Sequence, residues 1–347
     1  MSQRSILMLG VATLIVMLAA LLLTAQREQA TVDSGPLVPG LRAQINEIKA
    51  IDITGSDGQV IAVLRRRDER WLVENRDAYE ADFRRVHDFL RELALAQRAE
   101  PRTAQDEWFA RLGLADIGSA DAGGVLVELP DTDLPAVILG HQDQTTGARF
   151  ARLPDEPGTW LTDRSLSIPD RPVLWLERSV MDIPASELAE VTILHADGEQ
   201  VRLRPADDDG DQWVLLDVPE GREAGPRWEI RPVANGLASV VLEDVRRHDG
   251  HIPDDAVRSL YVTRDGLNFI VSLFRDDAGA WAHFSVSAEP SAPHEDELSE
   301  ADQALMIDAA AVDARLSPWQ FALDRRKFEV MTRRLEALLA PIADPRT

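Results

Sequence analysis

The sequence of 347 residues contains no cysteine, and only Lys49 and Lys327 among its 37 basic residues are lysines. The absence of cysteine excludes disulfides, thiolate nucleophiles, cysteine-ligated zinc and iron–sulfur clusters. Basic charge is also outweighed by acidic charge, because 60 acidic residues give a formal net charge of -23. Such a chain repels phosphate groups, so we expect no nucleic-acid partner.

Catalytic signatures are missing as well. The sequence has no G-x-S-x-G elbow, no phosphate-binding glycine–lysine loop, no G-x-G-x-x-G after a strand and no H-E-x-x-H. Carboxylates are so numerous that choosing two of them for acid–base work would be arbitrary. We therefore expect no catalytic residue, no cofactor and no metal, and the chain is not expected to be an enzyme.

Two clusters resemble metal sites in part, and both fail on spacing. The aspartate-rich run of residues 207–211 has its glycine too early for an EF-hand loop and lies where a hairpin turn is expected. His248 and His251 have the spacing of a helical ligand pair, but Gly250 and Pro253 would break a helix there. Neither cluster is assigned a metal.

A long uncharged run stands near the N-terminus, at residues 6–25. A helix rises about 1.5 Å per residue, so the run is long enough to cross the roughly 30 Å hydrocarbon core of a bilayer. Arg4 precedes it, and a short positive tail tends to stay in the cytoplasm. We expect residues 1–28 to be a cytoplasmic tail and a single-pass anchor. A cleaved signal peptide is the alternative, but it would need a shorter run and a small-residue cleavage pattern.

The rest of the chain reads as a tether and two like units. Residues 29–45 are rich in glycine and proline and are expected to be a flexible tether. A pattern of strand, Asp-Gly turn, strand, tryptophan strand and helix then occurs twice, with Ile53 and Ile193 separated by 140 residues. This repetition predicts an internal duplication with units at residues 46–180 and 181–345.

The predicted fold class is α+β, with antiparallel hairpins and packed amphipathic helices. Helices are expected over residues 82–96, around residues 233–245 and over residues 325–339, and a loop over 290–300. Four tryptophans near strand starts are expected to cover the rims of the sheets; an aromatic ligand platform is the alternative. They are Trp71, Trp160, Trp213 and Trp281.

Several phrases resemble a bacterial family designated domain of unknown function 4340. They are EIKAIDITGSDGQVIAVLRRRDERWLV (residues 47–73), FARLGLAD (109–116), AVILGHQDQTTGARFARL (136–153) with TWLTDRSLSIP (159–169), and WLERSVMDIPASELAEVTI (175–193). These are structural phrases without a catalytic signature, so the resemblance transfers no site residue.

The resemblance implies a location and a role. Members of that family look like membrane-anchored proteins, often encoded beside an ABC-type ATPase, a permease and an auxiliary subunit. The expectation is therefore a periplasmic accessory or scaffold protein of a bacterial inner membrane, associated with an ABC-type transport system. A small-molecule or lipid binding module with a cleft between the two units is one alternative, and a hydrolase with an unrecognised site is another.

Overall fold

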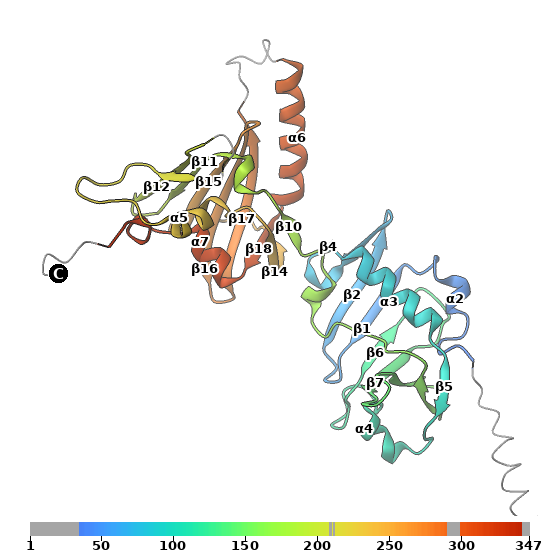
Figure 1. The fold of residues 1–347 in the computed structure, drawn as a ribbon. Coiled ribbons are helices and arrows are strands. Elements are labelled where there is room, and N and C mark those ends of the chain that lie inside the picture. The colour runs from blue at the N-terminus through green and yellow to red at the C-terminus, as the bar shows by residue number, and fades with distance from the viewer. Residues whose placement is uncertain (1–34, 208–209, 211, 290–298, 342–347) are drawn as a thin grey trace, which may run out of the picture. The chain divides into compact units, whose positions relative to one another are not determined.

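Two compact units make up the chain. A computed structural model describes residues 35–207, 210, 212–289 and 299–341. The contacts within the chain divide it into a first and a second compact unit (Figure 1). Unit 1 comprises the described residues up to Glu69 together with Arg84–Asp170, and unit 2 comprises Arg70–Phe83 together with the described residues from Arg171 onward.

The first sheet has nine strands in the order β4-β3-β2-β1-β6-β7-β8-β9-β5, of which β3 and β4 belong to the segment grouped with unit 2. On β1 and β2, Ile51 pairs with Leu64 and Ile53 with Ala62, and all four side chains are buried. This alternation places every second residue in the core of the unit. The strands are β1 Ala50–Thr54, β2 Val60–Arg67, β3 Arg70–Val73, β4 Tyr79–Glu80, β5 Arg98–Pro101, β6 Val125–Glu128, β7 Val137–Gln142, β8 Arg149–Arg152 and β9 Thr159–Thr162.

The second sheet also has nine strands, in the order β10-β14-β18-β17-β16-β15-β11-β12-β13. Its neighbouring strands pair antiparallel, and the longest ladder joins β16 to β17 from Leu267 and Ala288 to Asp276 and Gly279. The fold class is thus mixed α+β with two large antiparallel sheets. The strands are β10 Ser179–Met181, β11 Leu188–Leu194, β12 Gln200–Pro205, β13 Trp213–Leu215, β14 Val240–Arg247, β15 Val257–Thr263, β16 Leu267–Asp276, β17 Gly279–Ala288 and β18 Trp319–Leu323.

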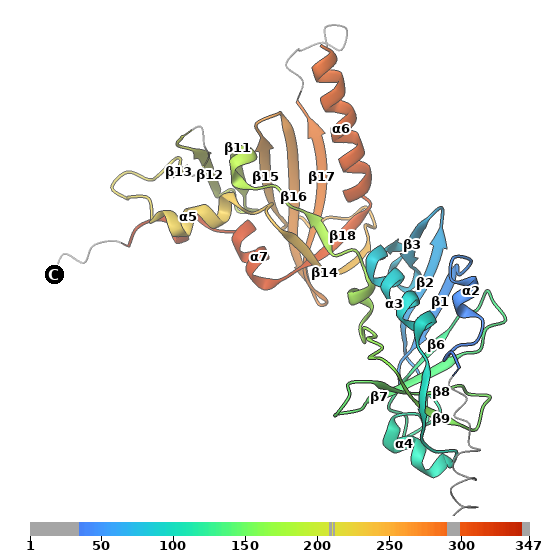
Figure 2. The same ribbon diagram turned by 45° about the vertical axis from the view of Figure 1, so that its right-hand side comes forward.

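Few helices accompany the sheets. In unit 1, α3 lies against the sheet and buries Val86, Leu90 and Leu93 at three- and four-residue spacing. In unit 2, α6 runs beside β17, while α5 and α7 lie next to each other (Figure 2). The helices are α2 Leu41–Gln44, α3 Phe83–Leu95, α4 Phe109–Leu112, α5 Arg227–Ala234, α6 Glu300–Leu316 and α7 Arg325–Met331, with 3-10 turns η1 Glu74–Arg76, η2 Asp106–Trp108, η3 Pro172–Trp175, η4 Ala185–Glu187 and η6 Leu335–Leu338.

The same hairpin turn occurs in both units. In unit 1 the N–H of residue 55 donates to the carbonyl of Gln59, and the N–H of Gln59 donates to the Asp57 carboxylate at 2.9 Å. In unit 2 the N–H of His195 donates to the carbonyl of Glu199, and the N–H of Glu199 donates to Asp197 at 3.1 Å. The two turns thus close with the same pair of hydrogen bonds, 140 residues apart.

A connecting segment crosses the outer face of each sheet. In unit 1 the chain between β5 and β6 packs Phe109 and Leu114 onto Ile138. In unit 2 the chain between β14 and β15 packs around Phe274 and Trp281, again outside the main core. Apart from the edge strands β4 and β10, the strand order and the crossing segments therefore follow the same plan in the two sheets.

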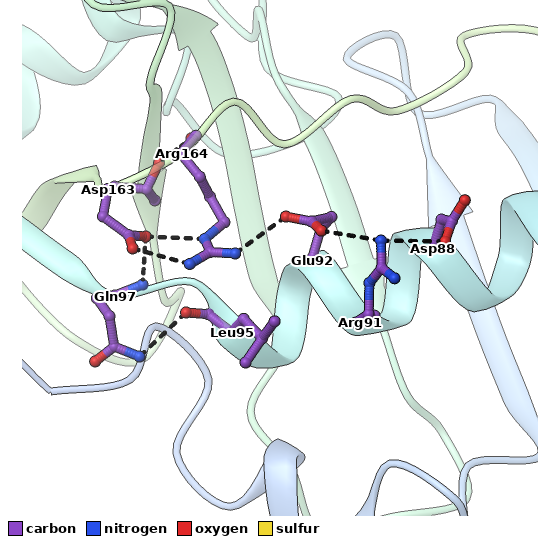
Figure 3. Close-up of polar contacts among 8 residues, drawn as sticks. Asp88, Arg91, Glu92, Leu95, Gln97, Asp163 and Arg164 are labelled. Carbon is purple, nitrogen blue, oxygen red and sulfur yellow. Dashed lines mark hydrogen bonds and ion pairs between the residues drawn. The ribbon is translucent and has the colours of Figure 1, made fainter.

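An ion-pair network fixes the end of α3 to the end of β9 (Figure 3). Arg164 contacts Asp163 and Glu92, each at 3.0 Å, and Asp163 also accepts a hydrogen bond from the N–H of Gln97 at 2.8 Å. Partial burial raises the pKa of Asp163, but the hydrogen bonds from Arg164 and Gln97 outweigh it and leave that pKa below its usual value. Because Asp163 and Glu92 are both paired with Arg164 of the same unit, we assign this network a structural role.

The segment preceding β1 differs from the predicted tether. Leu37 and Leu41 are fully buried, and the N–H of Leu37 donates to the carbonyl of Ala96 at 2.8 Å. The glycines and prolines here are interspersed with leucines and a valine that bury apolar surface, so residues 35–45 pack onto unit 1.

The predicted anchor, residues 6–25, and the start of the tether, residues 29–34, lie outside the described residues. Within the described part of the chain, no helix combines the length and hydropathy needed to cross a membrane.

The predicted helix around residues 233–245 is wrong except for its first two residues, because residues 235–239 form a turn and the rest form a strand. Helix α5 ends at Ala234, and Val240–Arg247 form strand β14. A register shift between Leu242 and Asp244 lets Val240, Leu242 and Val245 all face the core, which imitates helical spacing in the sequence.

Two further helical segments differ from expectation. Helix α6 was not predicted because its alanine-rich sequence lacks a distinct apolar stripe, although Ser299 and Asp302 form a capping box at its start. The predicted helix over 325–339 divides into α7 and η6.

Candidate functional site

A cavity of about 470 Å³ lies at the surface of unit 2, where α5, the turn after it and α7 come together. Its principal lining residues are Trp228, Arg231, Asn235, Asp324, Arg326 and Lys327. Cavities of this size are typical of sites for small ligands or for one or two side chains of a partner. We treat it as the candidate functional site and name it the α5/α7 cavity.

Helix α5 supplies an aromatic side chain to this cavity. Ile230 and Val233 bury the inner face of the helix, so Trp228 and Arg231 are left on the outer face, one turn apart. The side chain of Trp228 is 70% exposed, which is unusual for so large an apolar group. An exposed tryptophan beside an arginine has the composition of a binding hot spot.

Helix α7 supplies two cations. The Asp324 carboxylate caps the helix by accepting hydrogen bonds from the backbone N–H groups of Arg326 and Lys327 at 2.9 and 3.1 Å. Phe328 and Met331 are buried, which leaves Arg326 exposed at the cavity. The sequence thus fixes both the start of α7 and the face that it presents.

Lys327 joins the two sides of the cavity. Its Nζ donates hydrogen bonds to the carbonyl oxygens of Gly236 and Ala238, at 3.2 and 2.6 Å. Burial lowers the pKa of Lys327, Asp324 and Asp182 oppose this effect, and Arg326 adds to it. The ammonium group is therefore held in place by two carbonyl oxygens, with one N–H donor left over.

The charge of the cavity is opposite to that of the chain. Three cationic side chains and one carboxylate line it, in a protein whose formal net charge is -23. The carboxylate, Asp324, already serves as the helix cap. The arrangement therefore favours a ligand that carries both negative charge and an apolar group.

A second cavity, of about 490 Å³, lies in unit 1 and has different chemistry. Arg152 and Glu156 line it, but Arg152 is paired with Asp116 and Glu156 with the buried Arg98 at 2.8 Å. The charges within these pairs neutralise each other, and the other charged residues of the lining, Asp106 and Asp155, are both acidic. We therefore prefer the α5/α7 cavity as the functional site.

Of the two histidines considered as a metal pair, His248 has other contacts in the structure. His248 stacks instead on His283 with ring centroids 4.0 Å apart, and Gln320 lies 3.0 Å from His248 Nδ1. The backbone N–H of His251 donates a hydrogen bond to the Asp249 carboxylate at 2.9 Å. In the described ranges, no group of three or more His, Cys, Asp or Glu side chains is placed to hold a metal ion.

Unit 2 is expected to lose stability as the pH falls below about 6.5. Burial lowers the pKa of His283 from 6.5; the carbonyl of Ser317 and Asp313 oppose the shift, and His248 adds to it. A histidine with a lowered folded-state pKa stabilises the fold above its unfolded pKa and loses that contribution as it is protonated. Replacing His283 with glutamine should flatten the dependence of the unfolding midpoint on pH between about 7 and 5. An unchanged slope would contradict this role.

The other residues singled out from the sequence take structural positions. Trp71, Trp213 and Trp281 are buried, as expected for plugs of the sheets, and Trp160 is half-buried. Asp207 lies in the turn between β12 and β13, whereas residues 208, 209 and 211 lie outside the described residues.

Sequence patterns alone indicate little of the α5/α7 cavity. Trp228, Arg231 and Asn235 recur at the spacing of one helix face, which was a usable signal on the α5 side. Arg326 and Lys327 lie far along the chain, and only the fold places them beside Trp228.

Comparison with known families matches residues 71–256 to the family described as Domain of unknown function (DUF4340). The match spans more than half of the 347 residues and includes α5 but ends before α7. No curated protein and no solved structure matches the chain. On the extent of the family match, the chain belongs to the DUF4340 family.

Proposed function

We propose that this protein is a membrane-anchored extracytoplasmic accessory or scaffold protein, without enzymatic activity, that binds a partner protein at the α5/α7 cavity. The exposed Trp228 beside three cationic side chains is the observation that supports it. Tryptophan and arginine are enriched where protein interfaces carry most of their binding energy, and lone exposed tryptophans are rare elsewhere.

The anchor and the transport system complete the proposal. The uncharged run of residues 6–25 supports a single-pass anchor with the sheets on the periplasmic side of a bacterial inner membrane. The family resemblance supports an auxiliary role beside the permease, ATPase or auxiliary subunit of an ABC-type transport system.

The two units are, in our proposal, products of an internal duplication. Three features support it: the same order of eight strands in each sheet, the same turn hydrogen bonds 140 residues apart, and a crossing segment on each outer face. Among the described residues, only those of unit 2 have the α5/α7 arrangement, because those of unit 1 form no helix after β9 that corresponds to α7. Duplication therefore supplies the scaffold and unit 2 carries the site.

A small-molecule binding module is the second candidate, and the volume of about 470 Å³ favours it, since it lies within the range of ligand pockets. An apolar anion would satisfy the same side chains. If a partner protein is recovered only after an apolar anion is added, the small-molecule binding function is favoured.

Crosslinking in living cells tests the accessory role. Tagged full-length protein, purified from gently solubilised membranes after crosslinking, should bring down a permease and an ATPase, identified by mass spectrometry. The Trp228→Ala variant should recover clearly less of them than the unaltered protein does, and an unrelated anchored chain with the same tag measures the background. Recovery of the tagged protein alone would contradict the proposal.

A further inference from the structure

The α5/α7 cavity also indicates what its partner looks like, given the proposed function. We propose that it binds an acidic segment of a partner protein, in which a carboxylate contacts Arg326 and Lys327 and a neighbouring apolar side chain packs on Trp228. The aromatic side chain and the two cations line one cavity, so both contacts can form at once.

Arg326 is the cation most open to such a carboxylate. Other exposed arginines of unit 2 are committed, such as Arg325 to Glu329 at 2.8 Å and Arg334 to Asp197 at 2.6 Å. Among the described residues the side chain of Arg326 forms no hydrogen bond or ion pair. A guanidinium can take a carboxylate with two parallel hydrogen bonds, which gives direction as well as charge.

Lys327 contributes a fixed charge next to Arg326. Two of its three N–H donors are directed at the carbonyls of Gly236 and Ala238, and the third is left for a ligand. Its pKa is lowered chiefly by burial, so an incoming carboxylate would raise it. Binding is therefore coupled to a measurable change at this one amine.

Charge and shape favour a protein segment over a lipid surface. A bilayer rich in anionic headgroups is flat and would face much of unit 2, and the net charge of -23 opposes that approach. A narrow acidic segment reaches the cavity while charges more than about 10 Å away are screened. Small inorganic anions such as phosphate have no apolar group that could pack on Trp228.

Peptide titration with the full-length protein in detergent micelles tests the proposal. The probe is a capped peptide that alternates glutamate with leucine and phenylalanine, and its control carries glutamine at each glutamate. Lysine labelled with ¹³C at Cε gives side-chain signals from only Lys49 and Lys327, because the chain has no other lysine. The acidic peptide should shift the Lys327 signal and raise its pKa, while Lys49 stays unchanged.

Paired variants on α7 separate local contact from general charge. Arg326→Glu should weaken binding of the acidic peptide about tenfold or more, as expected for loss of a charge-assisted pair. Arg325→Glu makes the same change of charge at the neighbouring residue, which does not line the cavity. It should change the affinity for the peptide by less than about twofold. Unaltered hydrogen-exchange protection of α5 and α7 in the free Arg326→Glu variant shows that the cavity is still folded; the Lys327 signal cannot serve here, because Arg326 itself lowers the pKa of Lys327.

Three results would overturn the proposal: equal binding of the glutamine peptide, equal loss in both arginine variants, or binding of phosphatidylglycerol vesicles in place of the peptide. The outcome is separable from that of the proposed function. Capture of a partner from cells that is insensitive to Arg326→Glu refutes this site, whereas peptide binding without any captured partner refutes the accessory role.

Discussion

Replacing Gly140 with alanine is expected to destabilise unit 1 by about 3 kcal/mol or more, because the site has no room for a methyl group. A Cβ at Gly140 would overlap the carbonyl oxygen of Leu112 and lie 2.9 Å from the side chain of Leu114. Gly124 likewise has no room for a methyl group, because a Cβ there would overlap the carbonyl oxygen of Gly113. The crossing segment after α4 thus packs its backbone directly on β7 and on the start of β6.

Peptide-resolved hydrogen exchange on the full-length protein measures this effect, with unit 2 as the internal reference. Gly158→Ala is the matched control, since its added Cβ would meet only ordinary contacts at 3.5 Å or more. Gly140→Ala should accelerate exchange across β6, β7 and α4, and Gly158→Ala should not. Equal protection in the two variants would show that the close packing is not needed.

Replacing Trp175 with alanine is expected to cost about 3–5 kcal/mol, the range for emptying a buried aromatic site. Trp175 ends η3 in unit 2, is 0% exposed, and its carbonyl accepts a hydrogen bond from the N–H of Asp82 at 2.8 Å. The alanine would leave a cavity that the surrounding side chains can fill only in part.

Trp228→Ala is the natural comparison, because it removes the same side chain from an exposed position of the same unit. It should change the unfolding free energy by no more than about 0.5 kcal/mol, as surface substitutions do. Chemical denaturation of both variants, followed by hydrogen exchange in unit 2, gives the difference. A Trp228→Ala variant as unstable as Trp175→Ala would mean that Trp228 supports the fold and is not kept for binding.

Local patterns predicted much of this fold correctly. Alternation around Ile53 and Ile193, with an Asp-Gly turn after each, predicted both hairpins, since period two and turn chemistry are local properties. The stripe of Val86, Leu90 and Leu93 predicted α3 for the same reason. The family resemblance is confirmed by the match to residues 71–256.

Non-local features escaped prediction. The bulge in β14 is set by its pairing with β18, which the sequence of β14 does not reveal. Burial of Leu37 and Leu41 depends on unit 1 offering a surface to a segment rich in glycine and proline. The α5/α7 cavity is non-local in the same sense, because Trp228 and Arg326 meet only through the order of strands between them.

Photocrosslinking at position 228 tests the central claim most directly. Benzoylphenylalanine, an aromatic photocrosslinker, would be incorporated there in the full-length protein in cells, and at position 325 as the matched control. The account predicts a specific crosslinked protein from position 228 alone, with the crosslink mapping to an acidic segment of that partner. No crosslinked partner at 228, or the same products from both positions, would contradict the account.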